Sequence, residues 1–440
     1  MANIEIRQEK PLFQTKFRRN EMWTYFGPAF VASVAYIDPG NFAANIEGGS
    51  RFGYRLLWVL LWSNAMAILI QYLSAKLGIV TGLTLPQNCR KHFSRPMTIF
   101  LWVAAEVSAI ATDLAEFLGA ALGLYLLFGP AMLAHGWSRT ETLFAAALVS
   151  AVAVFLILAL DLAGYRWLEL GIMSFVGVIG LCYGFEVFLV HPDWKLAAFH
   201  ALVPTLDPKN FHSSLYVAVA MLGATVMPHV VYLHSALVQP RREEMVRLPK
   251  VEGQSRRRKY LQFELIDVFV AMNGAWLVNS AMIVMSAVAF GHLKDPVTTI
   301  EDAHRTLGPL LGPFAATVFA VALLCSGLSS STVGVMAGQV IIEGFLDIKF
   351  SIFLRRLITI IPAMVVIAIG LDPLKILILS QVVLCFTLPF ALIPLLVLTN
   401  RSSVMRSFVS ARRTRVAGWC AVGIILTLNV VLLGQIAMGQ

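Results

Sequence analysis

Two short polar interruptions occur in a chain that is otherwise rich in apolar residues. The first lies in "SVAYIDPGNFAANIEGG" (33–49), where Asp38 precedes Pro39 and Asn41 follows. Pro39 has no backbone N–H, so the carbonyl of Ala35, four residues earlier, cannot close its helical hydrogen bond. Inside a bilayer such a carbonyl costs several kcal/mol unless protein, water or an ion satisfies it. A carboxylate, an amide oxygen and a freed carbonyl together form a set of cation ligands.

The second interruption lies in "VAVAMLGATVMPHVVYLHSALVQ" (217–239). Pro228 frees the carbonyl of Ala224 in the same way, and Met227 adds a thioether. Oxygen ligands alone suit magnesium or calcium, whereas a thioether shifts the preference toward softer divalent transition metals. With Asp38 as the single anion, we expect the binding of an ion to be modest. Gly223 and Pro228 themselves are assigned to gating or packing.

The first interruption has a plainer interpretation, because Asp-Pro-Gly-Asn is also a turn sequence and the span could end there. The apolar flanks on the two sides of the turn reach membrane length only when they are joined. This favours a break within one membrane span over a loop between two.

Three acids, Glu106, Asp113 and Glu116, lie in the apolar stretch 97–128. Their i, i+7, i+10 spacing places them within an arc of about 80° on one helix face. Acids inside a membrane are costly and mark an aqueous or proton path by default. The alternative is structural ion pairing with Arg355 and Arg356, and both interpretations can hold together. The five residues are our candidates for a proton pathway.

Two histidines follow the second interruption. His229 is two residues beyond Met227 and could bind metal by type, but a single histidine in a membrane is more often hydrogen-bonded or handles protons. We therefore place His229 in the proton pathway. His234, seven residues after Met227, would share its face if the helix resumes, and is assigned to gating or packing.

Apolar residues make up 58% of the 440 residues and charged residues only 13%. Stretches of about 20 apolar residues, the length that spans a bilayer, recur along the chain. This predicts an all-α polytopic membrane protein with eleven spans, at 24–49, 56–80, 97–128, 142–163, 167–190, 214–238, 262–290, 311–345, 354–371, 374–399 and 415–437.

The net charge of +9 follows topology rather than nucleic-acid binding. Of the 34 Lys and Arg, 26 fall in segments on the side of the polar tail 1–20, which has no signal-peptide pattern. Basic residues concentrate on the cytoplasmic side, so we expect the N-terminus inside and, after eleven spans, the C-terminus outside. The scattered cysteines predict no disulfide framework.

The interrupted spans are the first and the sixth, which predicts two inverted five-span repeats with substrate bound between them. We expect one transmembrane domain over 1–440, with repeats at about 24–190 and 214–399 and an extra helix at about 415–437.

The segments "DPGNFAANIEGGSRFGY" and "GATVMPHVVYLHSALVQ" resemble the Nramp family of proton-coupled manganese and iron transporters. The likeness extends through "ATDLAEFLGAALGL" (111–124), "LLCSGLSSSTVGVMAGQVIIEGFL" (323–346), "LRRLITIIPA" (354–363) and "LSQVVLCFTLPFALIPLL" (379–396). It implies a LeuT-type 5+5 inverted-repeat fold with discontinuous helices 1 and 6. It also implies a metal site made of Asp38, Asn41, Met227, Gln381 and the carbonyls of Ala35 and Ala224.

The same resemblance implies that Asp38 first exchanges the proton, with Glu116 and Asp113 leading it to the cytoplasm. No enzyme activity and no resident cofactor are expected: manganese(II) or iron(II) is the cargo, and protons and the lipid bilayer are the partners. We expect a bacterial inner (plasma) membrane location and leave the oligomeric state open. The rival functions are magnesium or a sodium-coupled organic solute on the same fold, or an intramembrane metalloenzyme using His229 and Asp38.

Overall fold

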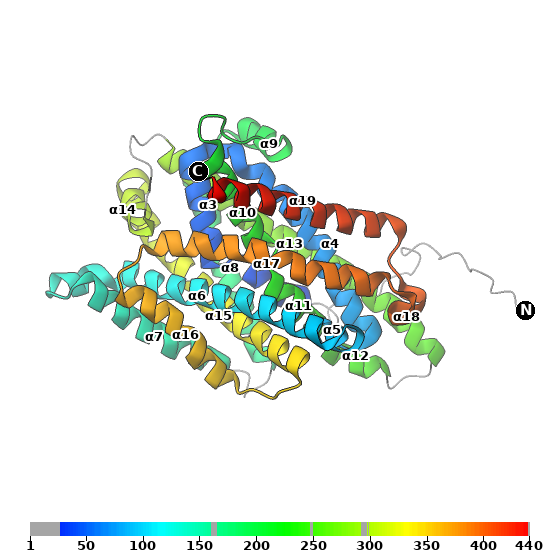
Figure 1. Cartoon of the computed structure of the whole chain (residues 1–440). Coiled ribbons are helices and arrows are strands. Elements are labelled where there is room, and N and C mark those ends of the chain that lie inside the picture. Colours follow the sequence, from blue (N-terminus) through cyan, green and yellow to red (C-terminus); the bar gives the residue numbers. More distant parts are fainter. Residues whose placement is uncertain (1–26, 160–164, 247–249, 292–296, 298, 439–440) are drawn as a thin grey trace, which may run out of the picture.

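The computed structural model describes residues 27–159, 165–246, 250–291, 297 and 299–438, and the secondary structure of these residues is entirely helical. Figure 1 shows the helices packed as one bundle. The α-helices are α2 (Pro28–Ala35), α3 (Pro39–Phe52), α4 (Leu57–Thr81), α5 (Leu85–His92), α6 (Arg95–Ala134), α7 (Arg139–Ala159), α8 (Tyr165–Val190), α9 (Trp194–Leu202), α10 (Phe211–Thr225), α11 (Pro228–Leu237), α12 (Gln239–Val246), α13 (Lys250–Phe290), α14 (Ile300–Leu311), α15 (Pro313–Leu346), α16 (Ile352–Ala368), α17 (Pro373–Asn400), α18 (Ser402–Met405) and α19 (Arg412–Ala437), with 3₁₀ turns η1 (Gly53–Leu56) and η3 (Arg406–Phe408).

Nine helical segments of the described chain are long and apolar enough to cross a membrane, against the eleven spans expected. The difference has two physical causes. The first expected span is split into α2 and α3, and α3 runs through η1 into α4 as one segment. The ninth expected span is α16, which has only 17 residues and carries Arg355 and Arg356 near its start. The sixth expected span is also broken, into α10 and α11.

Among the described helices, α6 and α15 share the most extensive contact, and glycines at that contact let the two backbones approach closely. A Cβ on Gly123 would meet the backbone of Leu324, and one on Gly327 would meet the backbone of Ala120. α3 packs against α13, and α17 packs against both α6 and α10. The broken helices are therefore held between long continuous ones.

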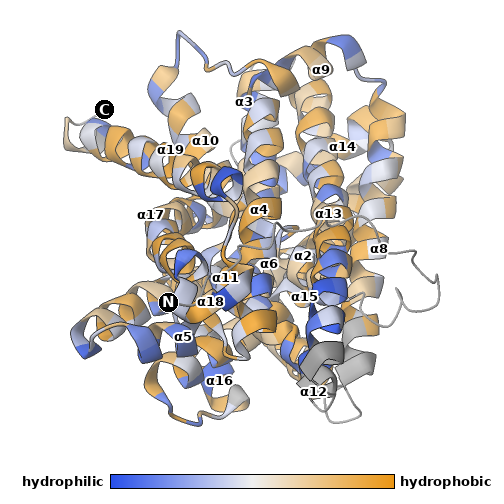
Figure 2. Cartoon of the chain, turned by 90° about the vertical axis from the view of Figure 1, so that its right-hand side faces the viewer, coloured by the Kyte–Doolittle hydropathy of each residue, from blue (hydrophilic) through white to orange (hydrophobic). Residues whose placement is uncertain are grey.

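Figure 2 shows apolar residues along the bundle and more polar ones around its ends. Large apolar side chains remain exposed on the outer helices, for example Leu181 at 77% and Phe188 at 75% on α8. Because water is absent from the hydrocarbon region, such a face is suited to contact with lipid. The helices α5, α12 and α18 lie together to the right in Figure 1, and α9 and α14 lie toward the upper left.

Several expectations fall on residues outside this description. They are the basic tail at 1–20, the first residues of span one (24–26), the end of span four (160–163) and residues 247–249 of the central basic loop. All five cysteines are described, and all are free thiols, as expected.

Candidate metal centre

The first break lies between α2 and α3 and is built around Asp38. Asp38 has an extended backbone and caps α3, where its Oδ1 accepts from the backbone N–H of Asn41 at 2.8 Å and from Nδ2 of Asn41 at 2.8 Å. Proline at the first helical position is favourable there because that N–H would have no intrahelical partner. The sequence thus ends one helix and begins the next within three residues, with the Asp38 carboxylate fully buried at the junction.

The break exposes three successive carbonyls, and two of them are capped by other helices. The carbonyl of Tyr36 accepts from Nδ2 of Asn279 on α13 at 2.7 Å, and that of Ile37 accepts from Oγ of Ser326 on α15 at 2.6 Å. The third belongs to Ala35, whose helical donor would be the proline nitrogen of Pro39. Ala35 is therefore the carbonyl of this turn with neither a helical donor nor a side-chain cap, which makes it available to a cation.

The second break lies between α10 and α11. Met227 has an extended backbone and precedes Pro228, which begins α11. The carbonyl of Ala224, freed by Pro228, accepts from Nδ2 of Asn41 at 3.0 Å. This hydrogen bond joins the two breaks across 183 residues of sequence, and the Met227 side chain beside it is fully buried.

Three oxygens of the expected metal set are buried and have no hydrogen-bond partner among the described residues: Oδ2 of Asp38, Oδ1 of Asn41 and Oε1 of Gln381. The Gln381 side chain lies directly against Gly40, so that a Cβ there would overlap its amide. Buried acceptors left without a donor are costly, and a cation is a partner that such oxygens accept. The Asn41 amide directs its nitrogen toward Asp38 and Ala224.

The residues assigned to gating or packing at the second break differ in role. A Cβ on Gly223 would meet the backbone of Gln381 and Cys385, so Gly223 allows α10 to approach α17 closely. Pro228 sets the start of α11. His234 instead belongs to a buried polar chain: its Nδ1 lies 3.0 Å from Oε1 of Gln71, and its Nε2 lies 2.8 Å from Oε1 of Glu264.

That chain reaches the first break. Nε2 of Gln71 donates to the Tyr36 hydroxyl at 2.6 Å, and Asp267, three residues after Glu264, accepts from the backbone N–H groups of Gly27 and Ala29. It therefore ties α11 and α4 to both ends of α2. This geometry gives His234 a structural connection to the short helix that carries Ala35.

The three acids of α6 meet the two arginines of α16, as the alternative interpretation of their spacing required. Nη1 of Arg355 lies 2.7 Å from Oε1 of Glu106, and Nη1 of Arg356 lies 3.4 Å from Oδ1 of Asp113. Nη2 of Arg355 is also 3.9 Å from Oδ2 of Asp113. Glu116, fully buried, lies within electrostatic reach of Asp38, Asp113 and Arg356. Glu106, Asp113 and Glu116 therefore form an acid stripe that extends from the two arginines toward Asp38.

Two glycines of α15 make room for these charges. A Cβ on Gly334 would overlap the Glu116 carboxylate, and a Cβ on Gly338 would overlap the Arg355 guanidinium. His229 completes the group, since its Nδ1 lies 3.1 Å from Oγ1 of Thr112, the residue before Asp113. His229 therefore faces the acid stripe.

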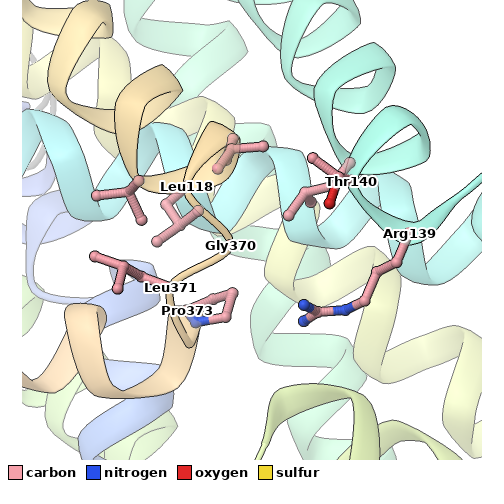
Figure 3. A pocket seen from close by; sticks show the side chains of 9 residues that line it. Leu118, Arg139, Thr140, Gly370, Leu371 and Pro373 are labelled. Atoms are coloured by element: carbon pink, nitrogen blue, oxygen red, sulfur yellow. The ribbon is translucent and has the colours of Figure 1, made fainter.

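Two pockets of the described chain lie away from the breaks. One is lined by Glu106 and Arg355 at the end of the acid stripe that faces away from Asp38. The other is shown in Figure 3 between α6, α7 and the turn from α16 to α17; Arg139, Thr140 and apolar residues line it.

Sequence reasoning missed Asn279, Ser326, Gln71 and Glu264, which position the breaks without being ligands. Each is a polar residue inside an apolar span, and that signal could have singled them out. It could not have paired them, because their partners lie on other helices. Among the described residues no group of three or more His, Cys, Asp or Glu is arranged to hold a metal. The candidate ligands at the two breaks are instead one carboxylate, that of Asp38, and neutral groups.

Comparison with known proteins places this geometry in context. The model of the family described as "Natural resistance-associated macrophage protein-like" (Nramp) matches residues 29–435. The "Divalent metal cation transporter MntH" of Caldanaerobacter subterraneus subsp. tengcongensis is 46% identical over 416 residues, which are 94% of each chain.

Solved structures agree. The crystal structure of the Eremococcus coleocola manganese transporter, in complex with an aromatic bis-isothiourea substituted compound, matches with a TM-score of 0.81 and 32% identity over 95% of this chain and 88% of that one. MhsT in complex with L-phenylalanine matches with a TM-score of 0.58 at 13% identity over 92% of this chain and 98% of that one, which shows a shared fold alone. The LeuT-type fold with discontinuous first and sixth helices is thereby confirmed.

Proposed function

The chain belongs to the Nramp family, and from that premise we propose that it imports manganese(II) or iron(II) together with protons. It is a multi-pass membrane transporter of divalent metal ions and not an enzyme. The observation that carries the finer proposal is the hydrogen bond from Asn41 to the Ala224 carbonyl, which brings the ligand sets of both breaks together.

In the proposed site, Asp38 supplies the one negative charge, and Asn41, Gln381 and the carbonyls of Ala35 and Ala224 supply neutral oxygens. The buried thioether of Met227 then favours softer ions over magnesium and calcium. Each neutral ligand replaces one water of the incoming ion, and the single anion keeps the binding weak enough for release. The stranded oxygens of Asp38, Asn41 and Gln381 support this assignment.

The cycle uses the breaks as hinges. α2 and α11 are short half-helices, and each can tilt about the segment next to the metal while α6, α13 and α15 stay in place. Opening one end at a time gives alternating access. The polar chain from His234 to the Tyr36 hydroxyl links the two half-helices on that side, so they are expected to move together.

For the proton, we propose a route from Asp38 to Glu116 and on to Asp113, with His229 beside it. Glu106 lies at the far end, next to a pocket that gives it space to exchange with solvent. Arg355 and Arg356 offset the negative charge of the stripe, which lets an acid lose its proton inside a membrane. The metal and the proton therefore both bind at Asp38, and their routes separate beyond it.

We further propose a plasma-membrane location with the N-terminus in the cytoplasm and the C-terminus outside, which the distribution of basic residues supports. The whole chain is taken as one transport domain, with repeats at about 24–190 and 214–399 and an added helix at about 415–437.

The decisive experiment is uptake of a metal panel into proteoliposomes with simultaneous recording of internal pH. Wild-type protein should carry manganese and iron, acidify the lumen and discriminate against magnesium. Asp38→Ala should abolish both fluxes while remaining folded, and Asp193→Ala, an exposed acid outside the spans, should behave as wild type.

Three outcomes would overturn the proposal. Manganese uptake by Asp38→Ala at the wild-type rate would remove the metal site. Uptake of magnesium or a sodium-coupled organic solute in preference to manganese would favour the rival substrates. Metal uptake with no internal pH change would remove proton coupling.

A further inference from the structure

Two long stretches of the sequence contain no acid at all. Asp and Glu are absent from 48–105 and from 373–440, although both stretches carry basic residues. The ends of these stretches that meet in space hold exposed cations: Lys91, Arg95, Arg401, Arg406, Arg412, Arg413 and Arg415. Such a surface has a net positive charge and attracts anions.

These cations belong to neighbouring elements at one end of the bundle. They lie at the end of α5, the start of α6, the corner from α17 through α18 to η3, and the start of α19; Figure 2 looks onto this end. The Arg401 guanidinium lies over the Phe93 ring at 5.9 Å, which joins the α17 corner to the segment after α5. In the described chain none of the seven pairs with an acid, whereas the neighbouring Arg90 pairs with Asp347 at 2.8 Å.

Directly beyond the cations, toward the middle of the bundle, the same helices expose apolar side chains. α17 packs between α6 and α19, and Figure 1 shows the three side by side. Met97 and Phe100 on α6 are 47% and 52% exposed, and Val416 on α19 is 54% exposed. Phe100 contacts Phe390 of α17 edge-on, with ring centroids 5.2 Å apart.

We propose that this surface binds anionic phospholipids, with phosphodiester headgroups on the basic residues and acyl chains over α17 between α6 and α19. Charge above and apolar surface below match the two ends of a phospholipid, and neither a free anion nor a soluble acidic protein would use both. Ser94 before α6 makes no side-chain cap to the first turn of that helix.

The proposal goes beyond the choice of cargo and gives the lipid a place to act. α17 carries Gln381, whose amide lies against Gly40 in the metal centre, and α17 also contacts α10 through Gly223. A lipid that holds the α17–α18 corner biases the position of that helix. We therefore expect anionic lipid to change the rate of metal uptake as well as to bind.

The test compares two variants with equal loss of charge. The first replaces Arg401, Arg412, Arg413 and Arg415 by glutamine. The control replaces four other exposed cations by glutamine. They are Lys195 in α9, Lys209 after α9, Arg305 in α14 and Lys375 at the far end of α17. Binding of short-chain phosphatidylglycerol, phosphatidylcholine and inorganic phosphate to the purified full chain is measured by native mass spectrometry, and uptake is measured in liposomes with and without phosphatidylglycerol.

A basic residue near a membrane surface changes anionic lipid binding about fivefold. The first variant should therefore bind phosphatidylglycerol at least tenfold more weakly and lose its stimulation of uptake, while the control stays within about twofold of wild type. A variant with lysine at the same four positions should retain binding. If the glutamine variant does not fold, raising the salt concentration on wild-type protein should release phosphatidylglycerol but not phosphatidylcholine.

Equal phosphatidylglycerol binding by wild type and the first variant would overturn the proposal, as would an equal loss in the control. Inorganic phosphate binding as tightly as phosphatidylglycerol would show a simple anion site instead of a lipid site. These binding readouts do not depend on which metal is transported or on proton coupling, so they are separate from the test of the proposed function.

Discussion

Asn279→Ala should weaken metal binding although Asn279 is not a proposed ligand. From α13 it donates to the Tyr36 carbonyl at 2.7 Å and accepts from Nδ2 of Asn45 at 2.7 Å. It therefore holds both halves of the first broken span. Alanine removes both bonds and leaves the Tyr36 carbonyl, in a residue that is 2% exposed, without its side-chain donor.

The size of the effect follows from that stranded carbonyl. A buried hydrogen-bonding group left without a partner costs about 1–3 kcal/mol. If a cost of about 2 kcal/mol falls entirely on the arrangement that presents Ala35 and Asp38, metal binding weakens about 30-fold. Ser326→Ala, which uncaps the neighbouring Ile37 carbonyl and removes only one hydroxyl, should weaken it about fivefold, for a loss of about 1 kcal/mol.

The assay is calorimetric titration of the purified protein with manganese(II), together with uptake in proteoliposomes. Asn273→Ala is the matched control, because Asn273 lies on the same helix and its hydrogen bonds, to Asn64 and to the Phe269 carbonyl, do not involve the break. A wild-type dissociation constant for Asn279→Ala would refute the argument that the capped carbonyls set the site. So would an equal loss in Asn273→Ala, since that would indicate a general effect on α13.

Three further predictions concern the ligands and the acid stripe. Met227→Ala leaves only oxygen ligands, so it should keep part of the manganese uptake and lose discrimination against calcium, measured by competition; unchanged selectivity would remove the role of the thioether. Gly338→Ala should displace the Arg355 guanidinium from Glu106 and reduce proton flux several-fold with little change in manganese affinity. Gly177→Ala is its control, because a Cβ there meets nothing within 4 Å, and equal proton flux in the two variants would contradict the reasoning. Glu116→Gln should uncouple the two fluxes, with metal uptake continuing while acidification falls; wild-type acidification would place the proton route elsewhere.

Much of the fold could be predicted because each signal is local. Apolar runs of membrane length predicted helices, and prolines at Pro39 and Pro228 predicted where two of them break. Nine helical segments of the described chain have the length and composition of a membrane span, fewer than the eleven expected. α16 is short and begins with buried charges, so only its pairing with α6 explains how it lies within the bundle.

The acid stripe was predicted in part. Spacing along one helix placed Glu106, Asp113 and Glu116 on one face, and the same chain offered Arg355 and Arg356 as partners. The glycines of α15 were different, since Gly334 and Gly338 suggest close helix packing by spacing alone. In the structure they make room for a carboxylate and a guanidinium, which only the position of α15 against α6 and α16 could reveal.

By itself the sequence determined that two spans break and which atoms each break frees, because a proline removes one N–H and thereby frees one known carbonyl. It also predicted the chemical character of the proposed site, whose side-chain ligands are one carboxylate, two amides and one thioether. Tertiary structure alone decided which freed carbonyls remain available. Asn279 and Ser326 cap those of Tyr36 and Ile37 from helices more than two hundred residues away, and Asn41 meets Ala224 across 183 residues. Hydrogen bonds between distant segments depend on how helices pack, and no local pattern of residues records that packing.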